Sequence, residues 1–315
     1  MKILVTGGAG FLGSNLCGRL LKEGHEVFCL DNLVTGKKNN IEEFLTNPLF
    51  KFENLDVTDV GELKDIDFDR VYHLASPASP NKHSSKSYLS LPFETMKVNS
   101  LGTWVLAQFA ADHKARFLFA STSEIYGDPL EHPQKEDYRG NTSTTGIRSV
   151  YDEAKRFGET VVSAFVRYKN LDGRIIRIFN TYGPKMDLED GRAVIEFVTR
   201  ALKNEEIPVF GDGSQTRSFC YVDDLIDGII KVMESEGTSG EVFNLGNPDE
   251  FTILELAEIV KKVTGSTSEI KLAEELPEDD PKRRKPDIDK ARRVLGWEPK
   301  VKLEEGLAKL TDYLK

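Results

Sequence analysis

The chain has 315 residues, of which 39% are hydrophobic and 30% charged, and its formal net charge is -10. This length suits one large α/β unit, or a large domain with a smaller one attached. The acidic balance argues against a general nucleic-acid or membrane-surface binder. No apolar run is long enough to span a membrane and no signal peptide is evident, so we expect a cytoplasmic location.

The first predicted strand covers residues 2–6 and leads into a glycine-rich turn and a helix. Gly7, Gly10 and Gly13 stand at G-x-x-G-x-x-G spacing rather than at G-x-G-x-x-G spacing. Glycines at such a strand-to-helix turn allow backbone amides to approach a pyrophosphate at the helix N-terminus. The turn therefore indicates a site for a dinucleotide.

A second predicted strand over residues 26–30 ends at Asp31. A carboxylate at this place accepts hydrogen bonds from the adenine ribose hydroxyls and repels a 2′-phosphate, so it favours NAD over NADP. The order of strand, glycine turn, helix, strand and terminal acid predicts an NAD-binding Rossmann unit.

Three more strands are predicted before the middle of the chain, over residues 51–55, 70–74 and 115–121. The first ends at Asp56, a candidate adenine contact, and the second runs into the small-residue loop 75–80. Ligands bind at the carboxyl ends of the strands in an open α/β sheet. The loop 75–80 is equally compatible with a simple proline-rich turn.

The long segment 94–113 has the pattern of an amphipathic helix.

Tyr151 and Lys155 are four residues apart, so on a helix they lie on the same face. A phenol beside a fixed ammonium would favour the phenolate, which makes a general base that works near neutral pH. Alone, this spacing is more often an ordinary helix surface. Downstream of an NAD site, it indicates a redox base.

The second half begins with a predicted buried strand over residues 172–179. Segments 221–233 and 242–245 are predicted to return to the sheet, and Thr252 with Glu255 predicts a capped helix. The segment 277–286 is predicted to be a charged, solvated loop. The fold class is therefore α/β, a Rossmann-type doubly wound parallel sheet with a smaller C-terminal α/β substrate-binding region.

Motifs along nearly the whole chain carry a family resemblance, at residues 6–13, 31–32, 73–80, 121–129, 149–156, 178–184, 213–219, 244–248 and 284–288. Among them are His73-Leu-Ala-Ser-Pro-Ala-Ser-Pro80, Ser121-Thr-Ser-Glu-Ile-Tyr-Gly-Asp-Pro129 and Ser149-Val-Tyr-Asp-Glu-Ala-Lys-Arg156. The chain resembles the extended short-chain dehydrogenase/reductases that act on nucleotide sugars. Within that group it is most similar to the UDP-glucuronate decarboxylases.

Residue 124 is the main discriminator within this group. The 4-epimerases usually carry a small hydroxyl or apolar residue there, and the 4,6-dehydratases an Asp-Glu pair at residues 123–124. The decarboxylases resemble the Thr-Ser-Glu of residues 122–124. A dehydratase needs an acid to expel the C6 hydroxyl, whereas CO2 leaves without such an acid.

The resemblance implies NAD-dependent decarboxylation of UDP-glucuronate to UDP-xylose through a 4-keto intermediate, with the hydride returned to C4. Tyr151 would take the 4-hydroxyl proton, and Lys155 would hold the phenolate and the nicotinamide ribose. Thr122 would bind the 4-oxygen. Glu124 would handle proton and carboxylate chemistry at C5, and Arg284 would stabilise the enolate.

The resemblance also implies two sets of binding residues. The expected NAD contacts are Gly7, Gly10, Phe11, Leu12, Gly13, Asp31, Asn32, Thr35, Gly36, Asp56, Val57, Leu74, Ala75, Ser76, Asn99, Tyr151 and Lys155. The expected nucleotide-sugar contacts are Ser79, Glu124, Asn180, Arg192, Arg217, Tyr221 and Arg284. The segment 277–286 would act as a flap that brings Arg283 and Arg284 to the ligand.

The domain boundaries follow from these assignments. Residues 1–180 would form the NAD-binding Rossmann domain, with residues 218–247 returning to it, and residues 181–217 and 248–315 would bind the nucleotide sugar. The helices near 94–113 and 149–169 would pair with their copies in a homodimer. No partner among nucleic acids or membranes is expected. Three widely spaced cysteines and five histidines show no metal-ligand spacing, so no metal site is predicted.

Two alternatives stay open. The segments 81–92 and 141–147 differ from their counterparts in the decarboxylases and lie where the sugar would bind. A 4-epimerase acting on a UDP-hexuronate or nucleotide hexose therefore remains the nearest rival. A non-catalytic NAD-binding protein is less favoured, because such a protein has no need to keep Thr122, Tyr151 and Lys155.

Overall fold

A seven-stranded parallel sheet forms the centre of the computed structural model, which describes residues 1–273 and 283–315. Its strand order is β11-β6-β5-β4-β1-β2-β3, and every neighbouring pair is parallel. The strands are β1 (Lys2–Thr6), β2 (Glu26–Leu30), β3 (Phe50–Glu53), β4 (Arg70–His73), β5 (Arg116–Thr122), β6 (Gly173–Ile178) and β11 (Val242–Leu245). The order reverses beside β1, as in a doubly wound sheet, so the predicted fold class is confirmed.

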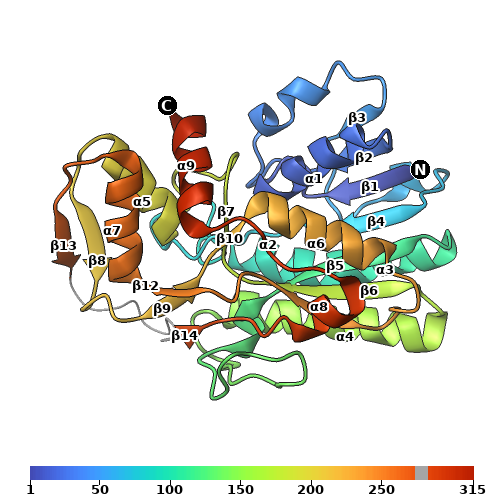
Figure 1. Cartoon of the computed structure of the whole chain (residues 1–315). Coiled ribbons are helices and arrows are strands. Elements are labelled where there is room, and N and C mark those ends of the chain that lie inside the picture. Colours follow the sequence, from blue (N-terminus) through green and yellow to red (C-terminus); the bar gives the residue numbers. More distant parts are fainter. Residues whose placement is uncertain (274–282) are drawn as a thin grey trace.

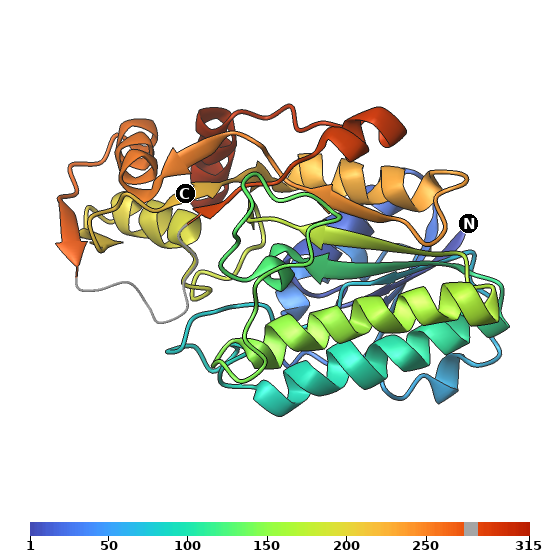
Figure 2. The ribbon, with the colours of Figure 1, turned by 90° about the horizontal axis from the view of Figure 1, so that it is seen from below.

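Helices cover both faces of this sheet (Figure 1). In Figure 2 the helices α3 (Thr103–Asp112) and α4 (Ser149–Lys169) lie side by side on one face. On the opposite face are α1 (Phe11–Lys22) and α6 (Val222–Glu234), which contact each other. One buried apolar cluster fills each face, because the strands bury side chains in both directions.

The segment predicted as one helix over 94–113 is interrupted. It consists of α2 (Pro92–Lys97), the π-helical turn η4 (Val98–Gly102) and then α3. The turn brings Asn99 into the interior, where its side-chain amide donates to Ser76 Oγ over 2.9 Å. Turns of this kind inside helices are frequent at functional sites.

A smaller region stands beside the carboxyl ends of the central strands (Figure 1). Strand β9 (Thr216–Ser218) pairs antiparallel with β12 (Glu250–Thr252) and parallel with β14 (Arg283–Arg284). The other elements are β7 (Thr181–Tyr182), β8 (Ile207–Phe210), β10 (Cys220–Tyr221), β13 (Ile270–Ala273), α5 (Ala193–Leu202), α7 (Ile253–Thr264), α8 (Asp289–Leu295) and α9 (Leu303–Leu314). Single-turn helices η1 (Lys38–Asn40), η2 (Glu42–Phe44), η3 (Gly61–Leu63) and η5 (Ser123–Tyr126) complete the described part.

The predicted helix cap at Thr252 is confirmed, since Thr252 and Glu255 form a reciprocal capping box at the start of α7. The prediction of a loop over residues 277–286 is wrong for Arg283 and Arg284, which form the strand β14. Residues 277–282 of this segment lie outside the described residues. The predicted division of the chain at residue 180 stays a prediction.

The described ranges 1–273 and 283–315 contain no helix with the length and apolarity needed to cross a bilayer. Across the same ranges, no group of three or more metal-binding side chains comes together. The three cysteines are free and buried.

Candidate active site

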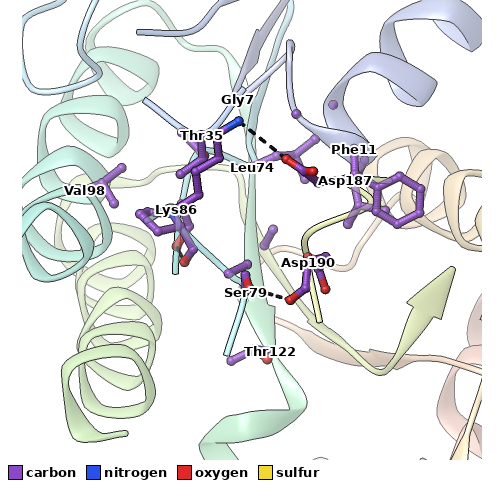
Figure 3. A pocket seen from close by; sticks show the side chains of 18 of the residues that line it. Gly7, Phe11, Thr35, Leu74, Ser79, Lys86, Val98, Thr122, Asp187 and Asp190 are labelled. Carbon is purple, nitrogen blue, oxygen red and sulfur yellow. Dashed lines mark hydrogen bonds and ion pairs between the residues drawn. The ribbon is translucent and has the colours of Figure 1, made fainter. Parts of the chain in front are cut away.

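A cavity of about 340 Å³ opens along the carboxyl ends of β1, β2, β4, β5 and β6 (Figure 3). Most of the residues proposed from the sequence line it: Gly7, Gly10, Phe11, Leu12, Gly13, Asp31, Asn32, Thr35, Asp56, Val57, Leu74, Ala75, Ser76, Ser79, Thr122, Glu124, Tyr151, Lys155, Asn180, Arg192 and Arg284. Residues separated by as much as 277 positions (284 − 7) therefore share one cavity. This edge of the sheet is where the α/β topology places ligands.

Four proposed residues are not among the lining. Gly36 packs against the Asp31 carboxylate, where an added Cβ would lie 2.7 Å from Oδ1. Asn99 is buried and donates its side-chain amide to Ser76 Oγ, and Ser76 in turn lines the cavity. Arg217 donates to its neighbour's carbonyl oxygen, and the Tyr221 ring packs edge-on against another tyrosine with 5.6 Å between centroids. The structure does not bring Arg217 or Tyr221 to the cavity wall, and their substrate contacts stay predictions.

The glycine turn leaves no room for a side chain at Gly7 or Gly13. A Cβ added to Gly13 would lie 2.1 Å from the Gly7 carbonyl oxygen, and one added to Gly7 would lie 2.7 Å from Ala75 Cα. Gly7 also has φ +71°, a conformation that suits glycine. The backbone thus reaches the cavity directly at the N-terminus of α1, which fits a pyrophosphate.

Asp31 directly follows β2, beside this turn. Its carboxylate accepts hydrogen bonds from the backbone amides of Ala9, at 3.0 Å, and Leu33, at 2.8 Å. Burial raises the pKa of Asp31, and these two amides oppose that shift. The neighbouring Asn32 amide donates to Asp56 over 3.0 Å. The glycine turn fits the pyrophosphate of an adenine dinucleotide, and the Asp31 carboxylate fits its ribose.

Tyr151 and Lys155 lie on the first turns of α4 and are both buried, 5% and 3% exposed. Lys155 Nζ donates to the Ala120 carbonyl oxygen over 2.7 Å and lies 5.8 Å from the centre of the Tyr151 ring. Helical spacing has therefore placed the two side chains on one face, as predicted.

The protonation preferences of the pair differ from the prediction. Burial raises the pKa of Tyr151 and the charge of Glu124 adds to this effect, while a hydrogen bond with Thr122 lowers it. Burial lowers the pKa of Lys155 to about 7. In the protein by itself, desolvation thus outweighs the neighbouring ammonium and favours the neutral phenol.

Glu124 is clamped between two arginines. Its Oε2 lies 2.6 Å from Arg148 Nη2, and its Oε1 lies 3.7 Å from Arg284 Nη1. The Tyr88 hydroxyl donates to Oε2 over 3.3 Å. Burial alone would raise the pKa of Glu124, but Arg148 and Arg284 lower it below its usual value, so the side chain is an anion at neutral pH.

Three residues of this cluster were missed by sequence reasoning. The Tyr88 ring stacks on the Tyr151 ring with 4.7 Å between centroids and 6° between planes. Asp152 is buried, has one unpartnered carboxylate oxygen, and has its pKa raised by burial and by Glu124. A signal existed for Arg148, because it stands three residues before Tyr151 and so one helical turn away.

The opposite wall is formed by the loop after β7. Ser79 Oγ donates to the Asp190 carbonyl oxygen over 2.7 Å (Figure 3), and the Asp190 carboxylate pairs with both Arg192 Nε and Nη2. Lys37 Nζ lies 2.8 Å from an Asp187 carboxylate oxygen at the mouth. Although burial opposes it, Asp190 raises the pKa of Arg192, which stays a cation beside the cavity.

The site combines a glycine-lined dinucleotide site, the Tyr151–Lys155 pair and the buried Glu124 carboxylate. This combination defines an NAD-dependent Rossmann-fold enzyme of the nucleotide-sugar type. Residues 3–246 match the NAD dependent epimerase/dehydratase family, and the chain belongs to this family. NAD is its cofactor.

Curated relatives carry a more specific name. The chain is 50% identical over 308 residues to UDP-glucuronic acid decarboxylase 3 of Arabidopsis thaliana, covering 98% of this chain and 87% of the relative. It is 47% identical over 312 residues to UDP-glucuronic acid decarboxylase 1 of Danio rerio, covering 99% of this chain and 72% of the relative. The resemblance inferred from the motifs is confirmed.

Solved structures share the fold at lower sequence identity. The UDP-glucose 4-epimerase of Thermotoga maritima, with UDP-glucose, superposes with a TM-score of 0.89 at 31% identity, covering 100% of this chain and 98% of that one. The UDP-glucuronic acid 4-epimerase of Bacillus cereus, in complex with UDP-glucuronic acid and NAD, gives a TM-score of 0.87 at 30% identity, covering 100% and 99%.

Proposed function

We propose that this protein is an NAD-dependent UDP-glucuronate decarboxylase that forms UDP-xylose and CO2. The observation that carries the proposal is the Glu124 carboxylate, held as an anion by Arg148 and Arg284 beside Tyr151. The relatives of about 50% identity that carry the decarboxylase name support it.

The reaction needs a base at the 4-hydroxyl and a charged environment at C5. Tyr151 takes the 4-hydroxyl proton, and Thr122 holds the oxygen from which it leaves. When bound, NAD accepts the hydride from C4 and later returns it. Lys155, an ammonium only at or below about pH 7 in the protein alone, supports the phenolate.

Decarboxylation follows from the 4-ketone, which stands β to the C6 carboxylate. The C5–C6 bond breaks, CO2 leaves, and the electron pair enters an enolate. An anionic Glu124 disfavours the substrate carboxylate nearby, and as CO2 leaves, the negative charge passes to the enolate oxygen at C4, where Arg284 of the cavity wall stabilises it. A proton from solvent would then add at C5, and Tyr151 would return its proton to the 4-oxygen as the hydride comes back to C4, which gives the 4-hydroxyl sugar.

The competing function is 4-epimerisation of UDP-glucuronate, favoured by the likeness to the epimerase solved with that ligand. Incubation with UDP-glucuronate labelled at C6 and with NAD separates the two. We expect labelled CO2 and UDP-xylose, with Tyr151→Phe as the inactive control. Formation of UDP-galacturonate without CO2 would replace the decarboxylase assignment by the epimerase one.

A homodimer is the second part of the proposal. Large apolar side chains on α2, η4, α3 and α4 face solvent, among them Phe93 at 76%, Trp104 at 52%, Leu101 and Phe157. These elements contact one another, and α3 and α4 lie side by side on one face of the sheet (Figure 2). An exposed apolar patch of this kind typically marks a protein interface.

A second copy packed on this surface would make a four-helix interface. Sedimentation velocity should give about twice the chain mass of 35.4 kDa for the wild type. Trp104→Glu should shift the protein to the monomer, because it puts a charge at the centre of the apolar surface. A wild-type monomer at micromolar concentration would contradict this part. A cytoplasmic location stays a prediction.

A further inference from the structure

Arg284 depends on other segments for its place in the site. It lies in the two-residue strand β14, whose register sets Arg284 opposite Arg217 of β9 (Figure 1). The side chain is 9% exposed and reaches Glu124 at 3.7 Å. A strand of two residues gives little rigidity, so the contacts just after it decide how well Arg284 is held.

The contacts after β14 converge on Gln134, which is fully buried. Its side-chain Oε1 accepts a hydrogen bond from the Lys285 backbone amide at 2.8 Å. Its backbone amide donates to the Lys285 carbonyl oxygen at 2.9 Å. Its carbonyl oxygen accepts the Asp287 amide at 2.8 Å. One glutamine thus binds both sides of the residue that follows Arg284.

Gln134 is in turn tied to the strand that carries Thr122. The Asn244 side-chain amide donates to the Gln134 carbonyl oxygen at 3.0 Å, and Asn244 Oδ1 accepts the Tyr126 hydroxyl at 2.8 Å. Arg177 donates to the same hydroxyl at 2.9 Å.

Glu159 completes the connection. It pairs with Arg177 at 2.8 Å and accepts the Ser121 hydroxyl at 2.5 Å, one residue before Thr122. A continuous, largely buried hydrogen-bond network therefore joins the segment after β14 to the end of β5.

We propose that Gln134 is a positioning residue for Arg284, acting through the Lys285 backbone to hold the guanidinium against Glu124. The inference rests on the proposed function, because it assigns Arg284 to the decarboxylation step. Gln134 has no place in the cavity lining. Its effect on the reaction can therefore come only through what it holds.

The test is a double-mutant cycle of Gln134→Met with Arg284→Gln. Methionine is close to glutamine in volume and leaves the backbone bonds in place, while it removes the acceptor for Lys285 and the side-chain donor to the Glu131 carbonyl oxygen. We expect kcat for UDP-xylose formation to fall roughly 10- to 30-fold with KM within about threefold, since small misplacements of a catalytic group cost this much. In the Arg284→Gln background the same change should alter kcat less than about twofold.

Lys135→Met is the matched control, because it places the same side chain at the next residue, which is exposed. It should leave kcat and NAD affinity unchanged. If Gln134→Met lowers kcat equally in both backgrounds, or in neither, the positioning role is overturned. If the wild type releases no CO2, the proposed function itself fails, which is a separate result.

Ser218→Ala is a second test, which stays informative if Gln134→Met does not fold. Ser218 Oγ lies 3.5 Å from the Arg284 carbonyl oxygen on the other side of β14. Its removal should lower kcat about two- to fivefold in the wild-type background and leave it unchanged with Arg284→Gln. An equal loss in both backgrounds would mean that a change at β14 affects the reaction otherwise than through Arg284, which contradicts the route proposed for Gln134.

Discussion

Arg148→Met tests whether the arginine clamp sets the charge of Glu124. The change removes the 2.6 Å ion pair to Oε2 and leaves the 3.7 Å contact from Arg284 to Oε1. Methionine preserves much of the packing of the arginine stem. The carboxylate then loses its nearer cation while it stays buried.

The magnitude follows from the geometry. Two charges about 4 Å apart interact with about 4 kcal/mol at an effective dielectric constant near 20. Rearrangement of Arg284 and of water recovers roughly half of this, so we expect about 2 kcal/mol to remain. At about 1.4 kcal/mol per pKa unit, the pKa of Glu124 should rise by one to two units.

The sign of the pH effect is fixed by the direction of that shift. Arg148 lowers the pKa of Glu124 in the folded protein, so its stabilising contribution is present above the unfolded pKa and is lost as pH falls through the folded value. Arg148→Met should therefore move the acid limb of kcat/KM upward by one to two pH units. Because the pKa of Glu124 starts at about 2, the carboxylate should stay ionised near pH 6 in both proteins, so turnover there should differ only a few-fold, and the loss should grow to about 10- to 30-fold only towards pH 2.

The assay is CO2 release as a function of pH, with NAD binding and thermal unfolding as checks on folding. Arg167→Met, at the exposed end of the same helix, is the matched control. An acid limb that coincides with that of the wild type, together with turnover within threefold, would refute the assignment of Glu124 ionisation to Arg148.

Three further outcomes are expected. Tyr151→Phe should lower kcat about 10²- to 10⁴-fold while NAD affinity, measured by calorimetry, stays the same; unchanged turnover would remove the general base. Gly13→Ala should weaken NAD binding more than about tenfold, because the added Cβ lies 2.1 Å from the Gly7 carbonyl oxygen, and normal affinity would contradict this role of the glycine turn. Burial lowers the pKa of Lys155 from 10.5 to about 7, so its penalty to stability is complete below pH 7 and gone above about 10.5. Lys155→Met should accordingly raise the unfolding temperature at pH 7 by a few degrees, with a gain that shrinks towards pH 10; a gain that grows with pH would contradict this.

The local features of the fold could be predicted from the sequence. Buried strands are visible in the sequence as short runs rich in Ile, Leu, Val and Phe. The predicted ranges 2–6, 26–30 and 242–245 therefore agree with β1, β2 and β11. The π-helical turn inside 94–113 could not, because it depends on packing between distant segments. Gly102 in that turn lies so close to Val57 that an added Cβ would be 2.7 Å from its Cγ2.

The site was predictable where its residues are close in the sequence or carry a family motif. Gly13 and Lys155 belong to local patterns, and Arg284 was found only by resemblance. Tyr88 was missed because its stacking on Tyr151 depends on how the whole segment after β4 folds. The pKa of Tyr151 was misjudged for a related reason: spacing shows the neighbouring lysine but not the depth of burial.

The electrostatics of the site link the two chemical steps. The anion at Glu124 raises the pKa of Tyr151, so a carboxylate that serves decarboxylation also opposes the phenolate needed for oxidation. Arg148 and Arg284 neutralise much of that charge without removing it, because they hold Glu124 ionised. These two arginines therefore keep the carboxylate charged at C5, while a third arginine, Arg192, lowers the pKa of the Tyr151 phenol. Without the two arginines, burial would raise the pKa of Glu124 and favour the neutral acid, so both the charge at C5 and its effect on the pKa of Tyr151 would diminish.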